Sequence, residues 1–147
     1  SQLDRFLMRL SLGYPDRAAE RALLKGQDRR AVLAHLPSVI SPAQLVQLQQ
    51  AVLTVHASDA LLDYLQNLIE ATRSGQWFAQ GLSPRAGIAI LKAAKAHAFI
   101  DQRDYVAPDD IQAIFAICAS HRLSALPQAG RSIHQQVLAL LKATPIS

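Results

Sequence analysis

The sequence has little of what several classes of protein require. A single cysteine, Cys118, excludes an internal disulfide, and only 5% of the 147 residues are aromatic. No apolar run approaches the roughly 20 residues that cross a bilayer, and no secretory signal pattern opens the chain. These absences exclude a disulfide-rich secreted domain and a membrane-spanning protein, and they favour a reducing, cytoplasmic setting. Because no Met precedes Ser1, we expect the chain to be a piece of a longer protein.

The glycine spacing of a phosphate-binding loop is also missing. That loop needs glycine, four residues, glycine, lysine and a hydroxyl residue, so that backbone amides hold phosphate while the last two side chains serve phosphate and magnesium. Gly81 and Gly87 are one residue too far apart, and Ile88 stands where lysine is required. We therefore expect this chain alone to hold no cofactor and to hydrolyse no ATP.

Self-contained catalytic and metal sites are equally poorly represented. The five histidines form no pair four residues apart and have no cysteine partners, which argues against a metal site. No serine, cysteine or carboxylate stands in a recognisable nucleophile pattern. The net charge of +4 comes from scattered residues and weakly favours an anionic partner.

What the sequence does contain is the residue composition and the start signals of helices. Half of its residues are apolar, and alanine and leucine dominate, which predicts a mainly α fold with one core. Start signals predict helices at Pro15, Ser41 to Gln44, Ser58, Ser83 and Pro108, and a last helix carries Ile133 to Leu141. The longest runs from Ser83 to about Asp101 and is expected to be central. Gln76 to Gly81 is expected to be a connector, and Ala31 to Leu36 stays open between a helix and a packed loop.

Residues Met8 to Tyr14 alternate between apolar and polar side chains, which is typical of a strand. No later segment offers a convincing partner strand of similar length. We therefore expect the sheet to which this strand belongs to lie outside the chain.

Arg85 stands at the second position of the predicted central helix. The helix dipole disfavours a cation there, while the free amides attract anions, so a bound phosphate would satisfy both. The plainer alternative is that Arg85 is solvated or pairs with a carboxylate such as Asp101. Lys92, two turns further on, either extends the same positive face or is solvated.

Several short strings occur together and in one order. They are Gln2-Leu3-Asp4-Arg5-Phe6, Gly13-Tyr14-Pro15, Val55-His56-Ala57-Ser58, Ser83-Pro84-Arg85-Ala86, Arg103-Asp104-Tyr105-Val106-Ala107-Pro108-Asp109-Asp110-Ile111 and His121-Arg122-Leu123. In this order the chain resembles the MoxR-type AAA+ ATPases over nearly its whole length. The resemblance implies that residues 1–14 end the α/β nucleotide-binding core, with its last strand, and that residues 15–147 form the helical lid domain, a helical bundle.

The resemblance also implies roles for particular residues. Arg85 takes the sensor-2 position, which contacts the γ-phosphate in its own or a neighbouring subunit. Arg5 takes the arginine-finger position, although a simple pair with Asp4 is the plainer alternative. Tyr14 and Pro15, at the junction of core and lid, would lie near the adenine. His121 and Arg122 are expected to be structural.

For the intact protein, the resemblance implies ATP hydrolysis with Mg²⁺ in a ring-shaped homo-oligomer, which we expect to be a hexamer. The hydrolysis would drive chaperone-like remodelling or maturation of partner proteins, with von Willebrand A domain proteins among the possible partners. Two alternatives lack nucleotide chemistry. One is a helical protein-interaction module, and the other is a nucleic-acid-binding module that would use Arg29, Arg30, Lys92, Lys95 and Arg103. The second lacks a basic stripe with interleaved aromatics, so nucleic acid is not the expected partner.

Overall fold

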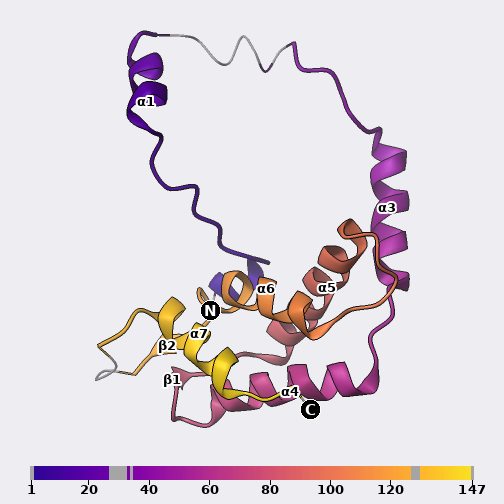
Figure 1. The fold of residues 1–147 in the computed structure, drawn as a ribbon, viewed down its shortest axis with the longest axis vertical. Coiled ribbons are helices and arrows are strands. Elements are labelled where there is room, and N and C mark those ends of the chain that lie inside the picture. The colour runs from indigo at the N-terminus through magenta and orange to yellow at the C-terminus, as the bar shows by residue number, and fades with distance from the viewer. Residues whose placement is uncertain (1, 27–32, 34, 127–129, 147) are drawn as a thin grey trace. The chain divides into compact units, whose positions relative to one another are not determined.

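The computed structural model describes residues 2–26, 33, 35–126 and 130–146. The chain divides into two compact units, one made of Ser1–Arg9 with Gln49–Ser147 and the other of Leu10–Leu48, and each is described by itself. The described residues form six α-helices, a short 3-10 helix and a two-stranded sheet (Figure 1). The predicted mainly α fold is confirmed. None of the described helices has the length and apolar character needed to cross a membrane.

Most helices begin at the residues that their sequence signals indicated. The elements are η1 (Gln2–Arg5), α1 (Arg17–Leu24), α3 (Pro42–Thr54), α4 (Asp59–Arg73), β1 (Phe78–Gln80), α5 (Pro84–Ile100), α6 (Pro108–Ala119), β2 (Ser124–Ala125) and α7 (Ile133–Ala143). Ser58 and Ser83 each accept the backbone N–H three residues further on, which satisfies an amide that the helix itself leaves free. Ser41 and Gln44 form the predicted reciprocal capping box.

Within the Leu10–Leu48 unit, α1 begins slightly later than predicted. Asp16 lies outside the helix and caps it by accepting the N–H of Ala19 at 2.7 Å. Half of the segment Ala31 to Leu36, whose conformation the sequence left open, lies outside the described residues.

The core of the larger unit lies among α4, α5, α6 and α7, and α5 packs most extensively on α6 (Figure 1). The buried face of α5 consists almost entirely of small residues, Ala86, Gly87, Ile90, Ala93, Ala94 and Ala98. Small side chains let the neighbouring helices approach closely, and Leu68, Phe115 and Leu140 fill the space around them with no exposed surface. The long apolar helix predicted from Ser83 to about Asp101 is confirmed.

The strand predicted from Met8 to Tyr14 is wrong, because these residues have no regular secondary structure. Arg9 donates its N–H to the carbonyl of Ile117 at 2.9 Å, which is a contact with a helix. Leu12 and Tyr14 are 99% and 100% exposed. Alternating side chains form a strand only when another strand pairs with the backbone, and no described segment does so here.

The expected connector from Gln76 to Gly81 contains β1, which the sequence did not reveal. It pairs antiparallel with β2, with Phe78 opposite Ala125. The strands have three and two residues, too few for a readable alternation. Phe78 is nonetheless buried in the core.

After β1, Gly81 approaches the end of α4 so closely that no side chain fits. A Cβ at this position would lie 2.7 Å from the carbonyl oxygen of Thr72. The next residue is anchored to the same turn: Leu82 donates its N–H to the Thr72 hydroxyl at 3.0 Å and accepts from Nε of Arg73 at 2.8 Å. The chain between β1 and α5 is therefore fixed against α4.

We expect Gly81→Ala to lower the free energy of unfolding by roughly 1–3 kcal/mol, because backbone atoms must move to admit the methyl group. Gly87→Ala in α5 is the matched control. Its methyl group would meet only Cδ1 of Ile69, at the end of a flexible side chain. Urea unfolding of both variants measures the difference, and an unchanged midpoint for Gly81→Ala would contradict the close approach.

The turn between α5 and α6 is organised by one buried carboxylate. Asp110 is 1% exposed, and each of its two oxygens accepts a hydrogen bond of 2.6 Å from the guanidinium of Arg103. One oxygen also accepts the N–H of Ala107 at 2.7 Å, which caps α6, and the other lies 2.7 Å from Nδ1 of His97 on α5. Burial raises the pKa of Asp110, but the hydrogen bonds from Arg103, Ala107 and His97 together outweigh it and lower the pKa to about 2.

The segment before α4 joins the same turn through its backbone. His56 donates its N–H to the carbonyl of Asp104 at 2.7 Å and accepts the N–H of Val106 at 2.9 Å. The short strings Val55 to Ser58 and Arg103 to Ile111 are therefore hydrogen-bonded to each other, and both have a structural role.

We expect Asp110 to stabilise the fold in a pH-dependent way. Because its folded pKa lies below the ordinary 3.8, the contribution is fully present above about pH 4 and is lost as the pH falls toward 2. The shift corresponds to about 2 kcal/mol. Asp110→Asn should remove at least this much at neutral pH and weaken the acid dependence.

The control is Asp109→Asn, an exposed carboxylate in the same turn of α6, which should change stability by less than about 0.5 kcal/mol. Chemical unfolding of both variants between about pH 7 and pH 3 makes the comparison. Equal losses from the two substitutions would show that the Arg103–Asp110 pair contributes nothing specific.

Candidate functional site

Three of the short strings meet around Asp4, which lies in η1. The hydroxyl of Ser83 donates to one carboxylate oxygen of Asp4 at 2.9 Å, and Nε of Arg122 lies 3.3 Å from the other. The same hydroxyl accepts the N–H of Ala86 at 3.1 Å, so it caps α5 while it holds Asp4. We call the contacts among Asp4, Ser83 and Arg122 the N-terminal clamp.

Arg122 extends the clamp to the main chain of residues 4–6. Its side chain is 3% exposed, and Nη2 donates to the carbonyl of Phe6 at 2.6 Å and to that of Asp4 at 3.4 Å. Nη1 donates to the carbonyl of Cys118 at 2.9 Å, which closes α6. Nε2 of His121 lies 3.0 Å from the carbonyl of Phe6, and because a carbonyl only accepts, we assign the His121 proton to Nε2. The prediction that His121 and Arg122 are structural agrees with these contacts.

A polar cavity of about 260 Å³ adjoins the clamp. It is lined by Leu3, Asp4, Gln80, Gly81, Ser83, His121, Arg122, Leu123 and Ser124. Nδ1 of His121 and Nε of Arg122 are both buried without a hydrogen-bond partner. Nε nevertheless lies within ion-pair distance of Asp4, so its charge is compensated although the two groups are not aligned for a hydrogen bond. Because all three clamp residues line this cavity, we treat the cavity and the clamp as one site.

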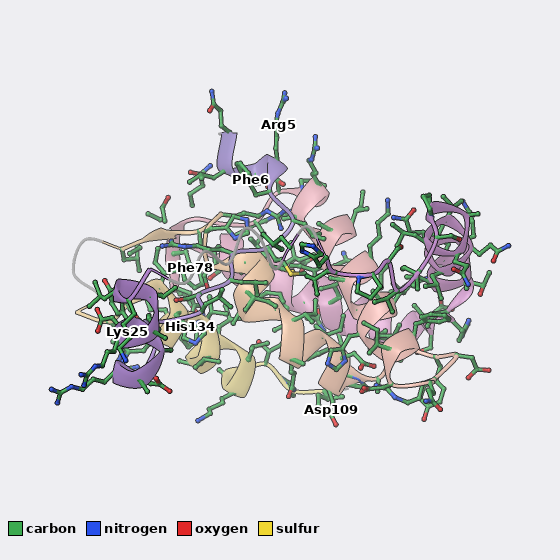
Figure 2. All side chains as sticks on the ribbon, turned by 90° about the horizontal axis from the view of Figure 1, so that it is seen from above. Arg5, Phe6, Lys25, Phe78, Asp109 and His134 are labelled. Atoms are coloured by element: carbon green, nitrogen blue, oxygen red, sulfur yellow. The ribbon has the colours of Figure 1, made fainter. Side chains whose placement is uncertain are left out.

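Arg5 follows Asp4 directly but does not pair with it. The guanidinium of Arg5 is exposed, and Figure 2 shows its side chain pointing away from the helices. Asp4 interacts instead with Ser83 and Arg122. Arg5 is therefore a surface cation that forms no ion pair with any described residue.

Arg85 is the second residue of α5, as predicted, and is also exposed. It pairs with no carboxylate of the described residues. Asp101, the partner considered for it, lies at the opposite end of the helix and contacts Nη2 of Arg103 at 3.2 Å. Lys92, on the same helix, is exposed as well. The structure thus leaves Arg85 as an uncompensated cation at the positive end of a helix dipole.

Tyr14 and Pro15 belong to the Leu10–Leu48 unit, whereas both arginines belong to the larger one. Both residues are exposed, and Tyr14 makes no buried contact. Their proposed position near an adenine stays a prediction, as do the roles of Arg5 and Arg85.

One group of side chains has the composition of a metal site. Ligand atoms of His97, Asp101 and Asp110 lie within 4.8 Å of one another. Both oxygens of Asp110 already accept from Arg103, and Asp101 contacts the same guanidinium. A divalent cation would have to displace this arginine, so the group fits an ion-pair network better than a metal centre.

Cys118 is an equally poor candidate for chemistry. It is fully buried in α6, and burial raises the pKa of its thiol against the opposing influence of Arg122. A nucleophilic cysteine needs access and a stabilised thiolate, and Cys118 has neither.

The helices that form the core match a known family. Residues 70–140 match the family described as the AAA lid domain. The chain is 38% identical over 129 residues to the uncharacterized protein YeaC of Bacillus subtilis, covering 88% of this chain and 40% of that protein. It is 32% identical over 132 residues to the chaperone MoxR1 of Mycobacterium tuberculosis, covering 84% and 34%, and 30% identical over 143 residues to the protein MoxR of Paracoccus denitrificans, covering 84% and 42%.

The fold agrees with that of a solved structure from Cytophaga hutchinsonii, with a TM-score of 0.82 and 27% identity over 99% of this chain and 48% of that one. The chain therefore spans between about a third and a half of the length of these relatives. The matched family region begins in the last turn of α4, includes α5 and α6 and ends in α7, so it contains three of the four helices that contribute most of the core. By both its sequence and its fold, the chain carries the helical AAA lid domain of the MoxR-type ATPase family.

Proposed function

We propose that the chain contributes two arginines to ATP hydrolysis by a larger MoxR-type ATPase. Arg5 acts as an arginine finger on the nucleotide of a neighbouring subunit, and Arg85 acts as the sensor-2 residue that contacts the γ-phosphate. The observation that supports this most strongly is that both guanidinium groups are exposed and have no carboxylate partner among the described residues.

The position of Arg85 suits an anionic ligand. The first turn of α5 lies at the positive end of its helix dipole, and the guanidinium adds a full charge beside it. A phosphate group would relieve this repulsion, and its oxygens match the planar fork of arginine.

The position of Arg5 suits action between subunits. A finger must project from its own subunit, and the side chain of Arg5 extends from a 3-10 turn without folding back on Asp4. Such residues neutralise the charge that develops on the transferred phosphoryl group and contribute about 10³ to 10⁵ in rate.

The remaining parts of the site would come from the nucleotide-binding core. This sequence has no phosphate loop, and its candidate metal ligands are occupied by Arg103, so the residues that hold Mg²⁺ belong elsewhere in the protein. When bound, Mg²⁺ would neutralise charge on the phosphates. In this proposal residues 1–14 end the core and residues 15–147 form the lid, with Tyr14 and Pro15 near the adenine.

The intact protein would act as a ring-shaped homo-oligomer, because a finger in trans requires a neighbouring subunit. Its hydrolysis would drive the remodelling or maturation of partner proteins, in keeping with the chaperone name of the Mycobacterium relative. Proteins with von Willebrand A domains are the class of partner that we would test first.

In the intact protein, Arg5→Ala and Arg85→Ala should each lower kcat by at least about 100-fold, because each removes charge stabilisation in the transition state. Nucleotide affinity should fall much less. Both side chains are exposed, so stability should change by no more than about 0.5 kcal/mol. Steady-state hydrolysis measures kcat, and nucleotide titration measures the affinity. The exposed Arg131→Ala is the control. Wild-type turnover in Arg5→Ala or in Arg85→Ala would remove the role proposed for that residue.

The trans action of Arg5 predicts complementation. Subunits with Arg5→Ala, mixed with subunits whose phosphate-loop lysine is mutated, should recover hydrolysis, because some interfaces then combine an intact finger with an intact pocket. Activity is measured against the mixing ratio while native mass spectrometry verifies mixed rings. Mixed rings without any recovered activity would show that Arg5 does not act across an interface.

A further inference from the structure

The N-terminal clamp supports an inference that rests on the proposed function and deepens it. We propose that Arg122 and Asp4 are positioning residues that fix Arg5 on the lid, so that Arg5 and Arg85 are held by one hydrogen-bonded unit. Neither Arg122 nor Asp4 would touch the nucleotide.

Hydrophobic burial holds the segment of Arg5 only weakly. η1 has no buried residue, and Phe6 and Leu7 are 63% and 49% exposed. Met8 is the one apolar side chain of residues 2–9 found packed, partly buried, against the core. An exposed turn of this length has no intrinsic stability, so its position depends on the polar contacts that it makes with the helices.

Those polar contacts come chiefly from the end of α6. Arg122 donates to the carbonyls of Phe6 and Asp4 and lies 3.3 Å from the Asp4 carboxylate, while His121 contacts the Phe6 carbonyl. The N–H of Arg9 donates to the carbonyl of Ile117 in α6 itself, whereas His121 and Arg122 directly follow that helix. Because these contacts surround residue 5 on both sides, they fix the direction in which its side chain leaves the backbone.

The clamp also joins this segment to the start of α5. Asp4 immediately precedes Arg5 in the sequence, and Ser83 lies two residues before Arg85. The single hydrogen bond of 2.9 Å between Asp4 and Ser83 therefore connects the two arginines through very short lengths of chain. A displacement of the α5 terminus when Arg85 meets phosphate would be transmitted to Arg5 through this bond.

The residue types fit a positioning role. Arg122 directs its three nitrogens to separate groups, and the planar guanidinium spans these groups where the single nitrogen of an ammonium group does not. A buried arginine is costly to desolvate, and here the hydrogen bonds of Nη1 and Nη2 and the ion pair of Nε with Asp4 offset that cost. Arg122→Lys keeps the charge while removing this geometry, and it is therefore the informative substitution.

The first test follows the backbone of the intact protein by hydrogen exchange. Arg122→Lys should accelerate exchange by at least about tenfold at the amides of Phe6 and Arg9, which report on this segment. Arg103→Lys is the matched control, because it also breaks an arginine–carboxylate pair but makes no contact with residues 2–9. It should accelerate exchange at the turn between α5 and α6 only. Unchanged exchange at Phe6 and Arg9 in Arg122→Lys would overturn the proposal.

The second test measures hydrolysis. Asp4→Asn and Arg122→Lys should each lower kcat by roughly tenfold with a much smaller change in KM, since a displaced finger weakens the transition state more than substrate binding. If Asp4 acts through Arg5, then Asp4→Asn should cause little further loss in an Arg5→Ala background. Fully additive losses would contradict the positioning role.

The two proposals fail in different ways. If Arg5→Ala hydrolyses ATP normally, the proposed finger role of Arg5 is wrong and the positioning role falls with it. If Arg5→Ala is impaired while Asp4→Asn and Arg122→Lys are normal, the finger stands and only the positioning inference is rejected. Asp4→Asn, at a side chain that is 27% exposed, gives a second and milder variant should Arg122→Lys fail to fold.

Discussion

The contact on which the lid depends is the pair of hydrogen bonds between Arg103 and Asp110. A carboxylate that is 1% exposed is stable as an anion only when charge and donors surround it, and Arg103, His97 and the Ala107 amide provide them. The same carboxylate caps α6 and ties it to α5, the most extensive helix contact of the fold. A single buried anion thus connects α5, the turn after it and the start of α6.

A second arginine–carboxylate pair acts at the other end of α6. Arg122 and Asp4 hold the N-terminal segment, as Arg103 and Asp110 hold the turn. The two pairs differ in what they leave exposed. Arg103, His97 and Asp101 beside Asp110 all contact one another or Asp110, whereas Arg5 and Arg85 beside the clamp are exposed to solvent. The strings on which the resemblance to MoxR-type ATPases rests therefore contain structural residues, which are paired, and candidate phosphate ligands, which pair with no described residue.

The sequence predicted only in part which arginines are paired and which are exposed. Sequence resemblance singled out Arg5 and Arg85, and the structure is compatible with that choice because neither pairs with a carboxylate of the described residues. It did not reveal that Asp4 turns away from Arg5 toward Ser83, or that Arg122 is the buried residue that holds the segment. Nor did the alternation of Met8 to Tyr14 reveal that these residues form no strand, since alternation describes side chains and says nothing about a backbone partner.

The sequence by itself determined the helices, because their signals are local. A cap at Ser41, Ser58 or Ser83 acts three residues along the chain, and the apolar period of a helix is contained within it. Only the tertiary structure decided the clamp, because Asp4 lies 79 residues from Ser83 and 118 from Arg122. It also decided the pairing of β1 with β2, whose few residues carry no pattern of their own. Contacts between distant residues depend on how the helices pack, and no local pattern encodes that packing.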